Sequence, residues 1–254
     1  MDIIKQSEKF IGDIIPGVRE IILKYYQMSY DVEVKNDNSP VTIADREAEK
    51  FIRDKVMKVF PEHGIIGEEF GTYNNDAEFK WVLDPIDGTK SFISNTPLFG
   101  TLIALTKNNT PVLGCIYLPV TNEILIGNNR ETRLNGKTVR MPEEISLENS
   151  IVLTTDLKDF SKYKPQAGFN RLVSACRLSR TWGDCFGYYL VATGKAHVMI
   201  DPVMSVWDKM ALIPIIQGAG GAISDFHGNA PESGNSIVAS VRGVHGKVIE
   251  ILNS

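Results

Sequence analysis

The order of the apolar segments in this chain changes near residue 145, and that change constrains the fold more than any other feature. Before it, two helical patterns are followed by a series of short β-type runs. After it, strand-like and helical segments alternate. Successive strands favour an antiparallel sheet, whereas strand–helix alternation favours an α/β layer. We therefore expect an α+β half over residues 1–145 and an α/β half over residues 146–254.

The first half begins with two amphipathic helical patterns. Apolar residues recur at helical spacing over residues 8–28, with Pro16 inside the pattern, and again from near Thr42 to residue 60. Asn135-Gly136 lies between two β-type runs and predicts a hairpin. The other predicted strands of this half cover residues 65–66, 81–83, 98–106, 112–118 and 123–126.

The second half shows the expected alternation. Its predicted strands cover residues 150–154, 196–200, 222–225 and 236–240. Its predicted helices cover residues 169–176, 184–193, 207–217 and 245–252.

Charge and cysteine content exclude several classes of protein. The net charge of −4 argues against a nucleic-acid-binding face, and no apolar stretch approaches the roughly 18 residues of a membrane span. The beginning of the chain has no signal-peptide pattern. Three widely spaced cysteines, with no CxxC pair, argue against a disulfide framework or a zinc ribbon and favour the cytoplasm. Any metal is expected to have oxygen ligands.

Two aspartates end the apolar run of residues 81–83. Asp84 and Asp87 flank Pro85, which cannot donate to a strand ladder, so we expect the chain to turn there and bring Asp87 beside Asp84. Like charges that close raise each other's pKa, and a divalent cation removes that cost. Carboxylates, carbonyls and water are the ligands that Mg²⁺ prefers. A plain surface turn is the alternative interpretation.

Three further features favour a metal and phosphate site over a surface turn. Glu68-Glu69 follows an apolar run, Asp208 follows Trp207 at another element boundary, and Gly88-Thr89 offers N–H groups to an anion. The DxDGT motif of haloacid-dehalogenase-type phosphatases is a rival. Its two acids lie two residues apart, whereas Asp84 and Asp87 lie three apart with a proline between them.

In combination, these motifs resemble the inositol monophosphatase superfamily of Mg²⁺-dependent, lithium-sensitive phosphatases. The resemblance runs almost from end to end, and it implies a layered αβαβα sandwich of the inositol monophosphatase and fructose-1,6-bisphosphatase type. The motifs that carry it are GEE at 67–69, WVLDPIDGT at 81–89, and WD at 207–208 followed by AGG at 219–221.

The resemblance implies a cluster of two or three Mg²⁺ ions, for which Mn²⁺ is expected to substitute and which Ca²⁺ and Li⁺ are expected to inhibit. Asp84 would bridge the first two ions, and Pro85 would fix the turn that aims a carbonyl at one of them. The implied ligands are Glu68, Asp84, the carbonyl of Ile86, Asp87 and Asp208.

The implied reaction is in-line attack of water on a phosphate ester, without a covalent enzyme intermediate. Thr89 and Asp45, beside Glu68, would orient and deprotonate the water, and the N–H groups of Gly88 and Thr89 would cradle the phosphate. Asp45 also fits a capping box, because it comes three residues after Thr42. Glu69 is expected outside the ligand set.

Substrate contacts are implied for Gly183, Asp184, Cys185 and Asp201. Asp184 departs from the Gly-Thr-Ala that is common in inositol-type enzymes, and an added carboxylate suits a substrate that carries a cation. The run RTWGDCFGYYLVATGKAHVMIDP resembles the histidinol-phosphate phosphatase branch, whose substrate has an ammonium group and an imidazole. Asp184 also fits a helix-opening residue, and Asp201 a strand-end turn.

Three other functions stay open at this point. Inositol-1-phosphate is one alternative substrate. A 3′(2′),5′-bisphosphate nucleotide is another, for which Arg177, Arg180 or Trp182 would have to form the adenine pocket. A non-catalytic metal-binding or scaffold protein would lack one of the main acids, and all of them are present. The resemblance also implies a homodimer, with no nucleic acid or membrane partner.

Overall fold

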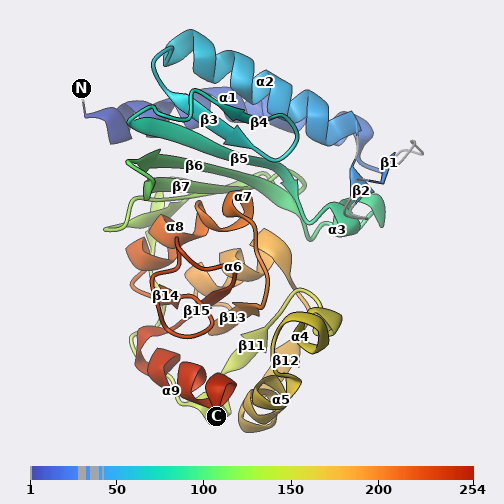
Figure 1. Cartoon of the computed structure of the whole chain (residues 1–254), viewed down its shortest axis with the longest axis vertical. Helices are drawn as coiled ribbons and strands as arrows, with labels where there is room; N and C mark the ends of the chain where they lie inside the picture. Colours follow the sequence, from blue (N-terminus) through green and yellow to red (C-terminus); the bar gives the residue numbers. More distant parts are fainter. Residues whose placement is uncertain (1, 28–32, 35–39, 42) are drawn as a thin grey trace.

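The computed structural model describes residues 2–27, 33–34, 40–41 and 43–254. Figure 1 shows five stacked layers: helices, a large sheet, helices, a smaller sheet and helices. This is the αβαβα sandwich that the family resemblance implies. In the described part of the chain, no helix combines the length and the apolar character needed to cross a bilayer.

The outer helical layer consists of α1 (Ile3–Tyr25) and α2 (Ile43–Val59), which pack on one face of the large sheet. α1 begins five residues earlier than predicted, because the Asp2 carboxylate caps it by accepting from the Ile4 N–H at 3.1 Å. Thr42, the predicted cap of α2, lies outside the described residues. A short antiparallel pair, β1 (Glu33–Val34) and β2 (Pro40–Val41), joins the two helices.

The large sheet has eight strands in the described part of the chain, in the order β10-β9-β8-β7-β6-β5-β3-β4. All neighbours are antiparallel except β3 and β5. The Asn135-Gly136 hairpin is confirmed, with φ of 49° and 78° at its two residues. The strands are β3 (Gly64–Gly67), β4 (Gly71–Tyr73), β5 (Phe79–Asp87), β6 (Gly100–Lys107), β7 (Thr110–Leu118), β8 (Glu123–Gly127), β9 (Thr132–Leu134) and β10 (Lys137–Val139).

The smaller sheet follows in the chain and has the order β12-β11-β13-β15-β14. A 3₁₀ turn (Leu147–Asn149) precedes the smaller sheet in the chain. The short helix α3 (Thr89–Ile93) belongs to the first half and follows β5. Helices α4 (Leu157–Tyr163), α5 (Gln166–Ala175) and α9 (Arg242–Asn253) cover its outer face. Its strands are β11 (Ile151–Leu153), β12 (Leu178–Arg180), β13 (Val198–Asp201), β14 (Ala222–Ser224) and β15 (Ile237–Ser240).

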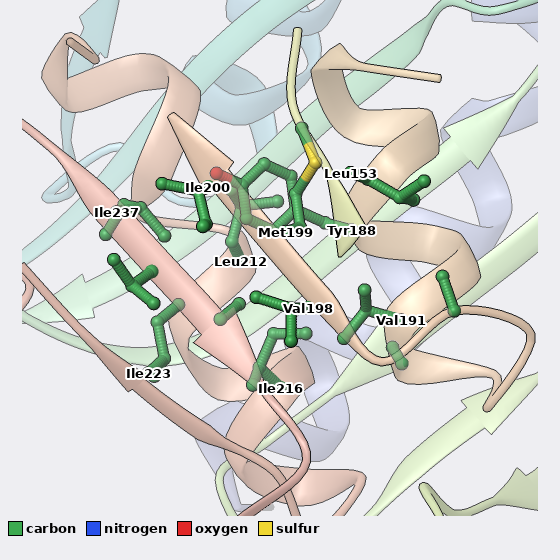
Figure 2. Packing of buried hydrophobic residues seen from close by; sticks show 14 of the residues in the cluster. Leu153, Tyr188, Val191, Val198, Met199, Ile200, Leu212, Ile216, Ile223 and Ile237 are labelled. Carbon is green, nitrogen blue, oxygen red and sulfur yellow. The ribbon is translucent and has the colours of Figure 1, made fainter. Parts of the chain in front are cut away.

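The helices between the sheets are α6 (Asp184–Ala192), α7 (Val206–Lys209) and α8 (Leu212–Gly218). α6 and α8 contact strands of both sheets, so apolar residues cover them on two sides. Figure 2 shows Tyr188 and Val191 of α6 and Leu212 and Ile216 of α8 packed with side chains of the smaller sheet.

The single helix predicted over residues 207–217 is wrong, because the structure divides it into α7 and α8. Pro214 explains the division. It has no N–H to donate to the carbonyl of Met210, and its ring would collide with that carbonyl in a continuous helix. In the structure Pro214 lies in the first turn of α8, where no N–H is needed.

α8 lies unusually close to the large sheet. Gly114 and Gly127 are direct partners on β7 and β8. An added Cβ would come within 1.9 Å of the Ala211 carbonyl oxygen at Gly114, and within 2.5 Å of the Ile215 Cα at Gly127. No side chain can occupy either position while α8 stays where it is.

Candidate active site

The predicted turn at Pro85 is wrong. β5 continues through it as a β-bulge, in which Asp84 pairs with Leu102 and Asp87 with Gly100, so that β5 has one residue more than β6. The bulge removes the need for a ladder N–H at Pro85. The carbonyl of Pro85 is satisfied instead by the Thr101 hydroxyl, which donates to it at 2.8 Å.

The bulge explains how two acids three residues apart face the same side of the sheet. Alternation along a strand would place them on opposite faces. The extra residue of the bulge shifts the alternation by one position, so that Asp84 and Asp87 face the same side. Leu83 and Ile86 both pack in the cluster under α1 and α2, and Asp84 and Asp87 both face α7.

The carboxylates of Asp84, Asp87 and Asp208 converge between β5 and α7. One oxygen from each lies within 4.8 Å of the other two. They form the floor of a cavity of about 340 Å³. The predicted site residues that line this cavity are Glu68, Asp84, Ile86, Asp87, Gly88, Thr89, Asp184, Asp201 and Asp208.

Burial and mutual repulsion raise the pKa values of these acids. Burial raises the pKa of Asp84 well above its usual range, and the charges of Glu68, Asp87 and Asp208 add to this. The pKa of Asp87 is raised by burial and then by Asp184 and Asp208. Burial raises the pKa of Asp208 to about 6. Such a concentration of carboxylates calls for a cation.

Asp208 is held by a capping box at the start of α7. Its Oδ2 accepts from the Ser205 N–H at 2.6 Å, and the Ser205 side chain accepts from the backbone of Asp208 in return. The short helix therefore fixes both the backbone and the carboxylate of Asp208, which lines the cavity.

Glu68 enters the site from the turn between β3 and β4. Its N–H donates to the carbonyl of Leu83 at 3.2 Å, directly before Asp84. Glu69 does not line the cavity. Its side chain is 3% exposed and lies 3.9 Å from the Arg46 guanidinium. Asp45 is buried in the first turn of α2, behind the cavity wall, where its charge contributes to the raised pKa of Asp84.

Gly88 and Thr89 form the next part of the wall. Gly88 has a φ of 88° and precedes α3, so the chain needs a glycine there to turn from β5 into the helix. The Thr89 hydroxyl donates to the Ile86 carbonyl at 3.1 Å. This bond orients the Thr89 side chain beside the acids, and the second lone pair of the Ile86 oxygen stays available.

A further part of the wall comes from α6 and β13, and the Asp184 carboxylate lies close to Gly88. Asp184 opens α6 with a φ of 50°, and burial raises its pKa to about 7, with Asp201 adding to the shift. Asp201, buried at the end of β13, accepts from the Thr155 N–H at 3.1 Å and from the Tyr188 hydroxyl at 2.9 Å. The sequence interpretations of both as element-end residues therefore hold, and both also face the cavity.

Gly183 and Cys185 flank Asp184 but do not line the cavity. Gly183 is the N-cap of α6 and packs against Thr155. Cys185 is buried, and its backbone N–H donates to the Asp87 carboxylate. The bond from Cys185 links α6 to β5 at Asp87. Cys115, Cys176 and Cys185 are all free thiols, as the sequence predicts.

The donor set fits a hard divalent cation. It is made of carboxylate and carbonyl oxygens, without the nitrogen or sulfur ligands that zinc sites use. Among the described residues, Asp84 Oδ1 is buried without a hydrogen-bond partner. A buried, unsatisfied carboxylate oxygen beside two more carboxylates is what a metal ligand looks like without its metal.

Sequence reasoning missed several residues around the cavity. Thr155 bonds to both Asp184 and Asp201, and Lys90 and Asp159 line the cavity mouth. Residues 157–163 were not predicted as a helix, so nothing in the pattern brought Asp159 near the site. Glu49 was also missed, although a glutamate between Ala48 and Ile52 on the apolar face of a helix was a usable signal.

Comparisons with known proteins give a consistent result. The sequence model described as the inositol monophosphatase family matches residues 8–254. A bifunctional phosphatase of Arabidopsis thaliana, IMPL2, is 40% identical over 212 residues. That match covers 82% of this chain and 61% of the relative. A histidinol-phosphatase of Chlorobaculum parvum is 37% identical, with 82% of each protein covered.

Solved structures agree in fold. An inositol monophosphatase from Zymomonas mobilis has a TM-score of 0.88 at 30% identity, with 100% of both chains covered. An inositol monophosphatase from Thermotoga maritima has a TM-score of 0.87 at 28% identity, covering 100% of this chain and 97% of the other.

Proposed function

We propose that this chain, which belongs to the inositol monophosphatase family, is a Mg²⁺-dependent phosphatase acting on histidinol phosphate. That it is a phosphoric monoester hydrolase follows from the family and from its phosphatase-named relatives. One observation carries the metal dependence. Carboxylates from β5 and α7, far apart in the sequence, bring their oxygens within 4.8 Å of one another on the floor of a cavity.

The proposed ligands divide into two sets. Glu68, Asp84 and the Ile86 carbonyl would hold one ion, and Asp84 would bridge to a second ion held by Asp87 and Asp208. When bound, the ions neutralise the phosphate, acidify a water and stabilise the leaving oxygen.

The chain's own residues orient the phosphate and the attacking water and accept a proton from that water. The N–H groups of Gly88 and Thr89 orient the phosphate above the acids. The Thr89 hydroxyl, already fixed by its bond to the Ile86 carbonyl, orients the attacking water, and Glu68, which lines the cavity, accepts its proton. The buried Asp45 does not line the cavity and would support this step through its charge. Attack comes in line, without a covalent intermediate on the enzyme.

The proposed substrate follows from the acids that α6 and β13 add to the cavity. Asp184 and Asp201 both line it, and the Asp184 carboxylate lies close to Gly88. A substrate with only hydroxyl groups can donate hydrogen bonds to these acids, whereas an ammonium or imidazolium group adds charge pairing in a partly buried site. Relatives named histidinol-phosphatase, at 37%, 29% and 28% identity, support this choice.

Two alternative substrates belong to the same family. Inositol-1-phosphate is favoured by the names of the solved structures. Its hydroxyl groups can donate to Asp184, but its neutral ring offers that carboxylate no cation. A bisphosphate nucleotide needs an adenine pocket in the cavity. Arg180 lines a separate cavity between α5 and β12, and neither Arg177 nor Trp182 lines the acidic one.

Phosphate release from four esters tests the proposal: histidinol phosphate, inositol-1-phosphate, 3′-phosphoadenosine 5′-phosphate and fructose-1,6-bisphosphate. We expect release to require Mg²⁺ and kcat/KM to be highest for histidinol phosphate. A higher kcat/KM for inositol-1-phosphate would overturn the substrate, and full activity in chelator would overturn the metal dependence. A homodimer, inhibition by Li⁺ and a cytoplasmic location are further proposals, based on the family resemblance.

A further inference from the structure

The turn that carries Glu68 is a three-residue hairpin connection. β3 and β4 pair through Gly67 and Gly71, and residues 68–70 connect them. The N–H groups of such a turn have no ladder partners of their own. Contacts from other elements to these N–H groups therefore help to hold the Glu68 side chain in place.

Glu49 of α2 binds that backbone. Its Oε2 accepts from the Glu69 N–H at 2.7 Å, and its Oε1 accepts from the Phe70 N–H at 3.1 Å. The carboxylate is fully buried. Two successive N–H groups that converge on one carboxylate form a small anion-binding nest, which here binds a side chain of the same protein.

Arg53 completes the arrangement one helical turn later. Its guanidinium lies 2.9 Å from Glu49 Oε1 and donates to the Gly71 carbonyl at 2.9 Å. The pair therefore holds the turn at both ends. A buried carboxylate is costly without such partners, and the three donors offset that cost.

Gly67 gives independent evidence of how closely the carboxylate fits. An added Cβ at Gly67 would lie 2.0 Å from Glu49 Oε1. The residue directly before Glu68 must therefore lack a side chain for Glu49 to reach the turn. On the other side, the Glu68 N–H bonds to Leu83 of β5, so the Glu68 backbone is held between α2 and β5.

We infer that Glu49 is a positioning residue for Glu68. It fixes the turn so that the Glu68 carboxylate faces Asp84 and Asp208, without touching substrate or metal itself. The inference rests on the proposed function in that it takes Glu68 to be a metal ligand. It adds a residue from α2 that no motif of the site contains.

Glu49→Gln tests this with almost no change in shape. The amide turns one acceptor into a donor that opposes an N–H of the turn. We expect Mn²⁺, titrated by calorimetry into the metal-free protein, to bind about 10- to 100-fold more weakly, as is typical when an outer partner of a metal ligand is removed. Glu47→Gln is the matched control. Glu47 lies on the same helix but bonds to Tyr25, and its variant should bind Mn²⁺ as the wild type does.

Gly67→Ala perturbs the same contact from the other side. Its methyl group would displace the Glu49 carboxylate, so we expect a similar loss of Mn²⁺ affinity. In a Glu49→Ala background the same methyl group should cost nothing further. Wild-type Mn²⁺ affinity in a folded Glu49→Gln protein would overturn the inference, even if its melting temperature were lower.

Hydrogen exchange covers the case in which the variants do not fold. In the wild type, the amides of Glu69 and Phe70 should exchange at least tenfold more slowly than those of the exposed Asn74–Asn75 loop. Equally fast exchange would overturn the inference. A wild type that binds Mn²⁺ but hydrolyses no ester would end the proposed function while the Mn²⁺ titrations still decide the role of Glu49.

Discussion

The hydroxyl of Thr155 accepts a hydrogen bond of 2.8 Å from the backbone N–H of Asp184, whose φ of 50° lies in the left-handed region. The N–H of Thr155 in turn donates to Asp201. A single residue of the segment after β11 thus bonds to the Asp184 backbone and to the Asp201 carboxylate. This favours Asp184 as a specificity residue, since the backbone from which its carboxyl group enters the cavity is fixed before any substrate arrives.

Replacing Asp184 should separate the candidate substrates. We expect Asp184→Asn to lower kcat/KM for histidinol phosphate at least about tenfold more than for inositol-1-phosphate, because only the first carries a cation. Asn tolerates the left-handed backbone, so this variant removes the charge alone. Asp184→Ala should show the same preference and should be less stable than Asp184→Asn, because alanine tolerates the left-handed backbone less well than asparagine does. Equal losses on both esters would remove Asp184 from the specificity argument.

Asp84→Asn should abolish both metal binding and phosphate release. Mg²⁺ at about 100 times its dissociation constant stabilises a protein that binds it by about 2.7 kcal/mol. We expect that gain, measured as a rise in melting temperature, in the wild type and not in the variant. Asp54→Asn, an exposed carboxylate on α2 paired with Lys50, is the control. Activity of Asp84→Asn equal to that of the wild type would contradict the site.

Asp201 should make the stability of the metal-free protein depend on pH. Burial raises its folded-state pKa from 3.8 to about 6. The protonated form therefore contributes stability that is complete below about pH 4 and is lost as the pH rises through 6. At pH 8 the loss is about 3 kcal/mol.

The variant Asp201→Asn keeps the shape and cannot ionise. We expect urea unfolding to show Asp201→Asn gaining stability over the wild type as the pH rises from 4 to 8, whereas Asp13→Asn on the exposed face of α1 should not. A constant difference across that range would refute the assignment of this pH dependence to Asp201.

Lys209→Met should destabilise the protein strongly. The buried Lys209 ammonium donates to the carbonyls of Pro231 at 3.1 Å and Glu232 at 3.0 Å, and also to that of Gly234. Methionine leaves these oxygens without their donor, at a cost of about 2–5 kcal/mol in the free energy of unfolding. Lys247→Met, at an exposed lysine of α9, should change it by less than about 0.5 kcal/mol. Similar urea midpoints for the two variants would contradict this role of Lys209.

Local patterns in the sequence predict the two halves, most of their helices and strands, and the proximity of Asp84 and Asp87, whereas the layered sandwich and the full set of acids follow from the family resemblance. Apolar periodicity locates most strands and helices, and an acid directly after an apolar run marks the edge where Asp84, Asp87 and Asp208 meet. The short, exposed strand β4 has no such periodicity and was missed. Without β4, the sequence does not predict the hairpin turn between β3 and β4, and so it gives no reason for a buried acid at Glu49.

The error at Pro85 has a different origin. The missing N–H of a proline excludes a regular ladder but not a bulge, and the choice between a turn and a bulge is made by the partner strand. Thr101 of β6, whose hydroxyl satisfies the Pro85 carbonyl, decides it. No pattern within residues 80–92 contains that information.

The paired glycines of β7 and β8 have a consequence for the distance between carboxylates on different layers. Because no side chain separates α8 from the sheet at these two points, the backbones are in contact. α7, which directly precedes α8 in the chain, is thereby held against β5. A single methyl group at Gly114, which does not line the cavity, should displace α7 and α8 from the sheet and move Asp208 away from Asp84. The distance between the carboxylates of Asp84 and Asp208 thus depends on the absence of side chains at Gly114 and Gly127.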